Sequence, residues 1–525
     1  MAAGDDYGNW RPGHNPWLVG FTVTLATFME VLDTSIANVA LPHIAGGLSA
    51  SQDEATWVLT SYLVSNAVVL PISAWISGRV GRKRFYMSCV VLFAASSFLC
   101  GLAPSLEALI FFRVLQGIGG GGLAPSEQAI LADTFPPAQR GMAFAMYGLA
   151  VVFAPAIGPT LGGYIVDNSS WRWIFYVNVP VGFVSLFLSS IMVEDPPWLR
   201  KEKERRVPVD WLGLGLVVVA FGSLQVVLDK GQEDDWFSSP MIVAFTVAAV
   251  ICMLGTLVWE SGHSGPVVNV KLFRNRNFAA STVLMFILGA VLYGSTVLIP
   301  LFLQTLMGYT AERAGEVLSP GGFLTMATMP LAGFLTARVA AKYLIAAAFA
   351  GLSLALFYMG GLNLDIDPWT ATMYRLYMAA TLAFLFVPIN TVCYLGVPRE
   401  ENNQVSGLMN LARNIGGSVG IAFVSTTLAR RSQTFQNLLV GHATGSNPYL
   451  RERLEQLQRA FLPAGPAQAL RRAYAALYMT VQQQAGLLSY VRIVQDFAMT
   501  CALLVPLILF LVKKNEPGAA AAGPH

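Results

Sequence analysis

The chain has 525 residues, of which 55% are hydrophobic and only 12% are charged. Soluble domains carry about twice that share of charged residues, whereas apolar runs of about 20 residues, which recur along this chain, are long enough to cross a bilayer as helices. The net charge of +3 is too small to indicate a nucleic-acid-binding protein. The composition therefore predicts an all-α polytopic membrane protein.

Hydropathy predicts fourteen spans, each near the length of about 17–25 residues that a helical crossing needs. In chain order they cover residues 17–41, 57–78, 85–103, 107–130, 142–165, 173–193, 210–228, 240–260, 278–303, 317–338, 343–362, 373–395, 406–428 and 493–512. An even number of spans places both termini on one side. About 19 Lys and Arg residues lie on that side, which makes it cytoplasmic by the positive-inside rule. The short external loops hold only Arg172, Lys230, Arg313 and Arg375.

The spans form two six-helix bundles with two additional helices between them. The predicted divisions are a cytoplasmic tail (1–16), an N-terminal bundle (17–193), a charged cytoplasmic linker (194–209), the inserted helices and their loops (210–277), a C-terminal bundle (278–512) and a second cytoplasmic tail (513–525). The sequences AWISGRVGRK (74–83) and GFLTARVAAK (333–342) occupy equivalent places in the two bundles and indicate an internal repeat. Carriers built from such repeats bind their substrate between the halves, near the midplane.

One external segment, residues 429–492, is long and polar, and long loops translocate largely regardless of their charge. Residues 448–461 and 467–490 are rich in helix-forming residues and are separated by two prolines, which predicts a helical hairpin. Either this hairpin packs on the outer surface of the protein itself, or it docks a periplasmic partner.

Ionisable residues at membrane depth are the strongest functional signal, because a charge there is costly and faces a partner or a polar cavity. The first span holds Glu30 and Asp33, and the fourth holds Arg113. Counted at 1.5 Å per residue, Asp33 lies about 12 Å and Arg113 about 10 Å from the outer ends of their spans, so the two side chains can meet. Glu30 lies nearer the midplane, and Asn38 extends the polar side of the span.

Two interpretations of these groups stay open. Burial disfavours an ionised carboxyl group and a nearby Arg favours it, so the proton affinity of such a group changes with pairing and water access. That property would make Asp33 or Glu30 a proton switch, with either carboxyl group as the carrier. Alternatively, Asp33 and Arg113 form a permanent ion pair that only holds spans 1 and 4 together.

Further polar and aromatic residues within the spans are candidates for lining a substrate cavity: Asn38, Gln116, Glu127, Gln128, Tyr293, Gln304, Phe323 and Asn390. Glu127, near the inner end of the fourth span, either selects cationic substrates or is a solvated or hydrogen-bonded end residue. In the thirteenth span, Asn410, Arg413 and Asn414 cluster on one helical face, which is typical of packing and gating groups. The aqueous segments contain no catalytic or metal-ligand motif, so we expect neither an enzyme nor a cofactor.

Several motifs resemble the major facilitator superfamily, and within it the fourteen-span drug:proton antiporters of the EmrB type. They are FMEVLDTSIANVALP (28–42), the Arg113, Gln116 and Gly117 motif of span 4, WRWIFYVNVPVG (171–182) and MGYTAERAG (307–315). Residues Pro155, Gly158, Pro159, Gly162 and Gly163 resemble the antiporter motif of span 5. The resemblance implies alternating access in the bacterial inner membrane, driven by the proton gradient, with Arg113 taking part in proton coupling.

The resemblance also implies a cytoplasmic gate and two protein partners. The gate motif keeps Arg79, Gly81, Arg82 and Lys83 but has Gly78 where the superfamily usually has an aspartate. Asp133 could replace it by pairing with Arg79 or Arg82, in an exposed pair worth about 0–1 kcal/mol. The implied partners are a periplasmic adaptor of the EmrA type and an outer-membrane channel of the TolC type, which together form a tripartite pump.

The function that follows from the sequence is proton-driven export of hydrophobic or amphiphilic drugs. Export of a specific endogenous metabolite, lipid or siderophore is an alternative of the same class. A membrane receptor or scaffold that transports nothing is a third, but such a protein gains nothing from costly charged groups within its spans.

Overall fold

The computed structural model describes residues 12–199, 209–263, 265–444 and 447–511, and every regular element in these ranges is a helix. Most of the two predicted tails and of the charged linker 194–209 lies outside the described residues. Proline occupies the first turn of several helices, where its missing N–H group costs no hydrogen bond. Ser51 and Glu54 form a capping box at the start of α2, which fixes where that helix begins.

The N-terminal half contains seven of the described helices. They are α1 (Pro16–Gly47), α2 (Gln52–Val80), α3 (Arg82–Leu102), α4 (Leu106–Thr134), α5 (Pro137–Asn168), α6 (Trp173–Tyr176) and α7 (Asn178–Met192). The single turn of α6 and the longer α7 together occupy the sixth predicted span, with a break at Val177.

The inserted pair consists of α9 (Trp211–Lys230) and α10 (Pro240–Gly262). The C-terminal half contains α11 (Arg276–Thr305), α12 (Ala311–Arg338), α13 (Ala341–Met359), α14 (Pro368–Val392), α15 (Asn402–His442), α16 (Pro448–Phe461) and α17 (Pro466–Leu511). Short 3-10 turns, such as Val270–Arg274 and Arg399–Glu401, connect some of these helices.

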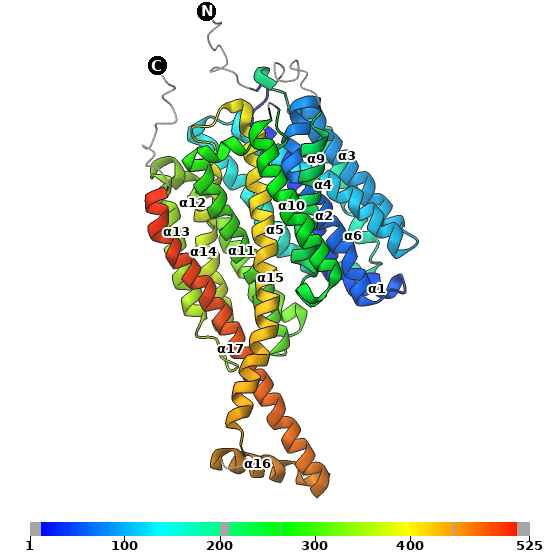
Figure 1. Ribbon diagram of the computed structural model, residues 1–525, viewed down its shortest axis with the longest axis vertical. Coiled ribbons are helices and arrows are strands. Elements are labelled where there is room, and N and C mark those ends of the chain that lie inside the picture. The colour runs from blue at the N-terminus through cyan, green and yellow to red at the C-terminus, as the bar shows by residue number, and fades with distance from the viewer. Residues whose placement is uncertain (1–11, 200–208, 264, 445–446, 512–525) are drawn as a thin grey trace, which may run out of the picture.

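Thirteen candidate membrane spans occur in the described part of the chain, and they coincide with thirteen of the predicted spans. The remaining prediction, 406–428, falls in α15, whose first turns carry many polar side chains. α15 nevertheless packs between α2, α11 and α17 inside the bundle (Figure 1). The predicted all-α fold of two helical bundles with an inserted pair is therefore confirmed.

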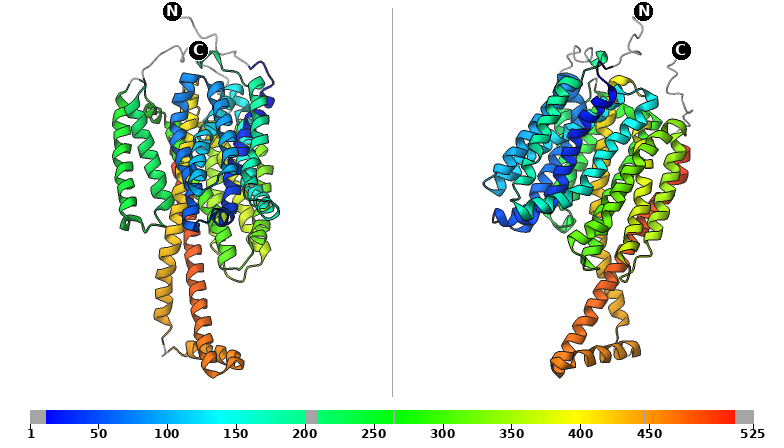
Figure 2. Two further views of the ribbon diagram at one scale, coloured as in Figure 1. Left: turned by 90° about the vertical axis from the view of Figure 1, so that its right-hand side faces the viewer. Right: turned by 180° about the vertical axis from the view of Figure 1, so that it is seen from behind.

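The two halves meet at the end of the bundle where α1 begins and α17 ends, which we call the Arg82 end. There α5 and α12 approach so closely that a Cβ atom added to Gly141 would lie 2.9 Å from the carbonyl oxygen of Gly333. α15 packs against α2 and α4 in the same region. Figure 2 shows the halves diverging toward the opposite end, which we call the α16 end.

The inserted pair contacts both halves through α9. Gln225 exchanges hydrogen bonds with Ser418 on α15 at 2.9 and 3.1 Å, whereas Thr60 on α2 donates to Asp229. Trp236, in the turn after α9, donates to Thr426 on α15 at 3.1 Å. α9 therefore lies beside the line along which α2 and α15 meet.

The polar segment predicted as an external hairpin is an extension of two membrane helices. α15 runs on to His442, and α17 is one helix of 46 residues from Pro466 to Leu511, because no glycine or proline interrupts 421–440 or 467–485. α16 crosses the tip of this pair (Figure 1). The extension projects away from the bundle, so the interpretation that it packs on the outer surface of the protein is wrong.

Candidate functional site: a buried ion pair and a polar latch

α1 and α4 bring the two opposite charges at membrane depth into contact. Nη1 of Arg113 lies 2.5 Å from Oδ2 of Asp33, and these residues are 0% and 2% exposed. Nε of Arg113 also donates to the carbonyl oxygen of Val58 on α2 at 3.1 Å. The predicted meeting of the charges of spans 1 and 4 is therefore confirmed.

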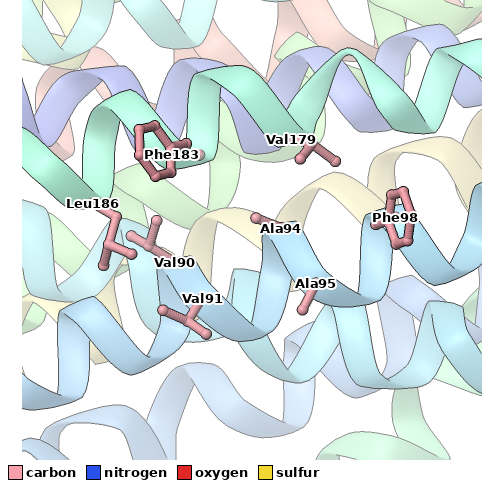
Figure 3. Close-up of a pocket in the computed structure, with 9 residues that line it drawn as sticks. Val90, Val91, Ala94, Ala95, Phe98, Val179, Phe183 and Leu186 are labelled. Carbon is pink, nitrogen blue, oxygen red and sulfur yellow. The ribbon is translucent and has the colours of Figure 1, made fainter.

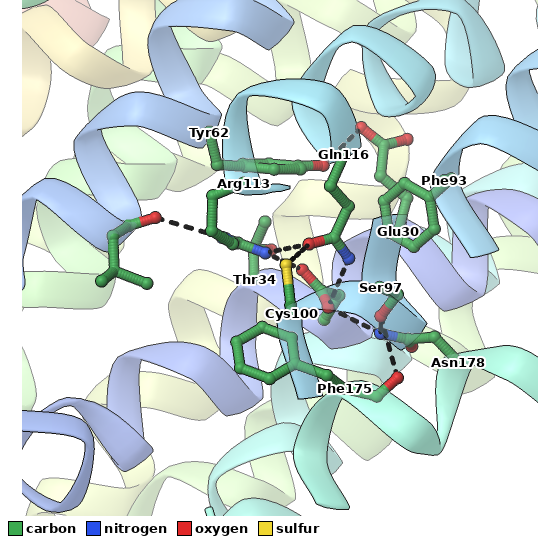
Figure 4. A network of polar contacts seen from close by, with 12 residues as sticks. Glu30, Thr34, Tyr62, Phe93, Ser97, Cys100, Arg113, Gln116, Phe175 and Asn178 are labelled. Carbon is green, nitrogen blue, oxygen red and sulfur yellow. Dashed lines mark hydrogen bonds and ion pairs between the residues drawn. The ribbon is translucent and has the colours of Figure 1, made fainter. Parts of the chain in front are cut away.

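Two amide side chains, those of Gln116 and Asn178, complete the surroundings of the Asp33 carboxylate; both are labelled in Figure 4. Its Oδ1 atom accepts hydrogen bonds from Gln116 at 2.9 Å and from Asn178 at 2.6 Å. Gln116 in turn accepts from Arg113 at 2.8 Å, and Asn178 also contacts Ser97 on α3 at 3.0 Å. The break between α6 and α7 places Asn178 at the first turn of α7. The carboxylate of α1 thus has partners on α4 and α7, and Asn178 extends the network to α3.

Tyr62 joins this network to Glu30. Its ring lies 4.3 Å from the guanidinium carbon of Arg113, in cation–π geometry, and its hydroxyl group donates to Glu30 at 3.4 Å. Glu30 also accepts from Asn66 at 2.9 Å, and Asn66 accepts from Asn414 on α15 at 3.2 Å. A continuous polar path therefore runs from the ion pair to the C-terminal half.

A second ion pair closes the Arg82 end. Nη1 of Arg82 lies 2.5 Å from Asp133, whose other oxygen accepts from Asn402 of α15 at 2.6 Å. The expected pairing of Asp133 with Arg82 is present, but the expectation of an exposed pair is wrong, because both side chains are only 2% exposed. We call Arg82, Asp133 and Asn402 the polar latch. Breaking a buried ion pair of this kind by removing one partner costs about 3–5 kcal/mol.

The other residues of the predicted gate lie in or near the turn between α2 and α3. Gly81 has a φ of 101°, a conformation that L side chains rarely adopt. The backbone N–H of Lys83 donates to Asp195 at 2.8 Å, and its Nζ donates to the carbonyl oxygen of Ser190 at 2.7 Å. The guanidinium carbon of Arg79 lies 4.2 Å from the centroid of the Trp75 ring.

Further polar contacts between the halves lie between the latch and the middle of the bundle. Asn403 donates to Ser77 on α2 at 3.3 Å, and Asn410 donates to Gln128 on α4 at 2.9 Å. The buried Arg413 donates to the hydroxyl group of Tyr147 on α5 at 3.3 Å. The polar face predicted for the thirteenth span therefore forms the interface with the N-terminal half.

The glycines of the predicted antiporter motif differ in what they contact. A Cβ atom on Gly158 would lie 2.2 Å from Oγ of Ser35 on α1, and one on Gly162 would lie 3.0 Å from Ile36. Gly163 has nothing within 4 Å of that position. Of the prolines, Pro155 accepts from Ser35 at 3.5 Å and Pro159 is exposed. The motif therefore lets α5 approach α1 closely.

The candidate cavity residues do not form one group. Glu127 is fully buried: Thr27 donates to one of its carboxylate oxygens, and the other has no partner among the described residues. It is therefore a hydrogen-bonded residue and not a solvated one. Gln116 belongs to the network of the ion pair, and Gln128 to the interface between the halves.

The other candidates lie apart from both. Asn390 is buried and donates to the carbonyl oxygen of Phe386 in its own helix at 2.9 Å, and Tyr293 packs on Gly417. Three further candidates are exposed and are not part of the polar network: Asn38, Gln304 and Phe323.

An apolar groove between α3 and α7 lies outside this polar core (Figure 3). It is lined by Val90, Val91, Ala94, Ala95, Phe98, Val179, Gly182, Phe183 and Leu186. Several of these side chains are exposed, among them Phe183 at 70%. This surface suits contact with lipid chains, so the groove is not the predicted substrate cavity.

Sequence reasoning missed Asn66, Tyr62 and Asn178 as members of the network. An uncharged amide or phenol within a span costs far less than a charge, so none of them stands out in the sequence. Asn178 lies in the motif WRWIFYVNVPVG, and its place at a break in the sixth span is the one local signal that could have found it.

Comparison with known proteins agrees with this architecture. The profile of the Major Facilitator Superfamily matches residues 23–421. The multidrug export protein EmrB of Haemophilus influenzae is 37% identical over 82% of this chain and 84% of its own length. The fatty acid resistance protein FarB of Neisseria gonorrhoeae is 33% identical over 99% of this chain and 100% of its own length.

Solved structures show the same fold at low sequence identity. The proton:xylose symporter XylE matches with a TM-score of 0.60 at 15% identity, over 96% of this chain and 97% of its own. A bacterial homologue of the lysosomal transporter Spinster, in an inward-facing conformation, matches with a TM-score of 0.54 at 19% identity, over 96% of this chain and 100% of its own. The chain therefore belongs to the major facilitator superfamily and is similar, within it, to the EmrB multidrug export proteins.

Proposed function

We propose that this protein is a proton-driven exporter of hydrophobic or amphiphilic compounds in the bacterial inner membrane, with both termini in the cytoplasm. The observation that carries the proposal is the buried network around Asp33. Its carboxylate has an ion-pair partner and two amide donors, and the network continues through Tyr62 and Glu30 to α15 of the other half. A scaffold has no use for such a costly arrangement.

The geometry supports a mechanism of alternating access. Protonation of Asp33 removes its negative charge and weakens its hold on Arg113, so α1 and α4 become free to shift. Because Tyr62 contacts both Arg113 and Glu30, that shift reaches Asn66 and its contact with Asn414. The inward proton gradient would in this way drive the change between outward and inward forms.

The proposal is tested in inside-out vesicles that hold a proton gradient. Adding an exported hydrophobic compound should dissipate the gradient, which a pH-sensitive dye reports. Asp33→Asn and Arg113→Ala should abolish this exchange, whereas Glu30→Gln should slow it without abolishing it if Asp33 carries the proton. Exchange by Asp33→Asn and Arg113→Ala at the parent rate would contradict the proposal.

A second candidate function is export of a fatty acid or a related endogenous amphiphile. Its support is the similarity to FarB, which covers 99% of this chain and 100% of that protein. The same vesicles distinguish the two functions when each rate is compared with that of Asp33→Asn vesicles, because fatty acids carry protons across a bilayer unaided. A fatty acid exporter accelerates the loss of the gradient with fatty acids and not with neutral or cationic drugs.

We also propose that the extension formed by α15, α16 and α17 docks a periplasmic adaptor of the EmrA type, which would link the protein to an outer-membrane channel of the TolC type. The extension leaves Tyr449, Tyr474 and Met479 exposed at 80%, 55% and 62%. Exposed aromatic side chains on a projecting element are typical of a protein interface.

A further inference from the structure

The structure assigns to Arg375 on α14 a binding site for the carboxylate group of an amphiphilic substrate. The inference rests on the proposed export function and names the charge of the substrate's head group. From the sequence, Arg375 is counted among the external basic residues, at the outer end of the predicted span 373–395. α14 begins at Pro368, however, so Arg375 lies seven residues, about 10 Å, inside the helix.

Arg375 is partly buried and has no counter-charge among the described residues. Its Nε and Nη1 atoms are inaccessible and have no hydrogen-bond partner, and no carboxylate among the described residues pairs with it. Of the buried arginines described above, Arg82 and Arg113 each have an aspartate, and Arg413 has the hydroxyl group of Tyr147. A guanidinium cannot lose its charge in a protein, so a buried one without a counter-charge favours an anionic ligand.

Gly321 on α12 makes room for this side chain. A Cβ atom there would lie 2.6 Å from Cγ and 3.2 Å from Nε of Arg375. The stem of Arg375 therefore lies against the backbone of α12, which fixes the direction of the guanidinium group. Arg375 therefore lies where two helices pack closely together, and not in a loop.

The helical register places Arg375 on the side of α14 that faces the other half. Phe386 is eleven residues further on, which is three turns and about 20° around the helix. Phe386 stacks on Tyr147 of α5 with ring centroids 5.9 Å apart. Arg375 lies about 16 Å from Phe386 toward the α16 end, where the halves diverge (Figure 2).

A carboxylate suits this site better than a neutral or cationic head group. It accepts two parallel hydrogen bonds from one guanidinium, which come from Nη2 together with either Nε or Nη1, and both Nε and Nη1 of Arg375 are without a partner. An apolar chain attached to that carboxylate would lie between the halves, along the side chains of α14 and α5.

The test measures binding of tritiated decanoate to the purified protein in phosphatidylcholine nanodiscs by scintillation proximity, without a proton gradient. Arg375→Gln should weaken decanoate binding by about tenfold or more, because a charge-assisted pair is lost. Arg375→Lys should lose less, since it keeps the charge. Arg471→Gln, which removes an exposed arginine from the extension, should bind like the parent.

Competition by decanol and by decyl phosphate identifies the head group. Decanol should compete weakly and equally in the parent and in Arg375→Gln. The inference is overturned if Arg375→Gln binds decanoate like the parent, if decanol binding falls in parallel, or if only decyl phosphate depends on Arg375. Decanoate binding is measured without a gradient, so failure of the inference and failure of the proposed export function are distinguishable. The parent can fail to bind decanoate while its proton exchange persists, and Asp33→Asn can bind decanoate while its exchange fails.

Discussion

At the scale of single residues, a few polar groups stabilise the buried charge of Asp33 in the candidate site. Asp33 has one cationic partner and two amide donors, and both amides come from helices other than its own. Each donor fixes the position of a helix as well as the charge. Asn178 is the clearest case, because it connects α7 to both α1 and α3.

We expect Asn178→Leu to lower the free energy of unfolding by about 1–3 kcal/mol, since it leaves a buried carboxylate short of one donor. Thermal unfolding of the detergent-purified protein measures this loss. Asn168→Leu is the matched control, because Asn168 is exposed and donates only within α5. Equal unfolding temperatures for the two variants would show that the contact of Asn178 with Asp33 contributes nothing.

The sequence was sufficient to predict the pair of Asp33 and Arg113, because an unpaired charge within a span is costly and these two opposite charges lie at similar depth. It was not sufficient to predict the burial of the pair of Arg82 and Asp133. Hydropathy places those residues near the aqueous boundary, but α15 packs against α4 there and its Asn402 donates to Asp133. The missing counter-charge of Arg375 depends in the same way on where neighbouring helices put their side chains.

At the scale of helices, α15 has two roles along one length. Its first turns carry the amides that hold the two halves together, and its later turns leave the bundle with α17. This division explains why α15 is not among the thirteen candidate spans of the described residues, although it lies inside the bundle. Helix positions were predictable from apolar runs, whereas helix ends were not, since polar residues continue a helix when nothing breaks it.

The polar latch predicts a conformational effect of one substitution. Asn402→Leu removes the hydrogen bond from α15 to Asp133 and keeps the ion pair of Arg82 and Asp133. A hydrogen bond to a charged group contributes about 1.5–3 kcal/mol, enough to shift a two-state population by about tenfold or more. We therefore expect the halves to separate more often at the Arg82 end.

Spin labels on Gln139→Cys and Ala337→Cys, at exposed positions of α5 and α12, report this separation by electron double resonance in a background with the native cysteines replaced by serine. The long-distance population should grow in Asn402→Leu. Asn363→Leu, at an exposed position outside the latch, is the control. A distance distribution unchanged from the parent would exclude the latch as a determinant of closure.

At the scale of the whole molecule, the protein combines a carrier of two halves with the projecting extension formed by α15, α16 and α17. Figure 1 shows α15 and α17 leaving the bundle together, with α16 across their tip. Gln436 on α15 donates to Tyr478 on α17 at 3.3 Å, so the two helices are in contact well outside the bundle core.

Because of that contact, the extension can be shortened without separating α15 from α17 inside the bundle. Replacing residues 437–477 by a short Gly/Ser turn should leave membrane insertion and proton exchange intact but abolish co-purification with the periplasmic adaptor. Insertion is checked by monodispersity, exchange by the vesicle assay and binding by affinity capture of tagged protein. If the adaptor is still captured at the parent level, the docking surface lies elsewhere.

The continuity of α17 has a mechanical consequence. Its 46 residues extend about 69 Å, and its first residue lies about 54 Å from the middle of the part within the bundle. A stiff arm of that length moves its far tip by about 1 Å for each degree by which the C-terminal bundle tilts. A protein bound at the tip would therefore sense, as a sideways displacement, which way the carrier faces inside the membrane.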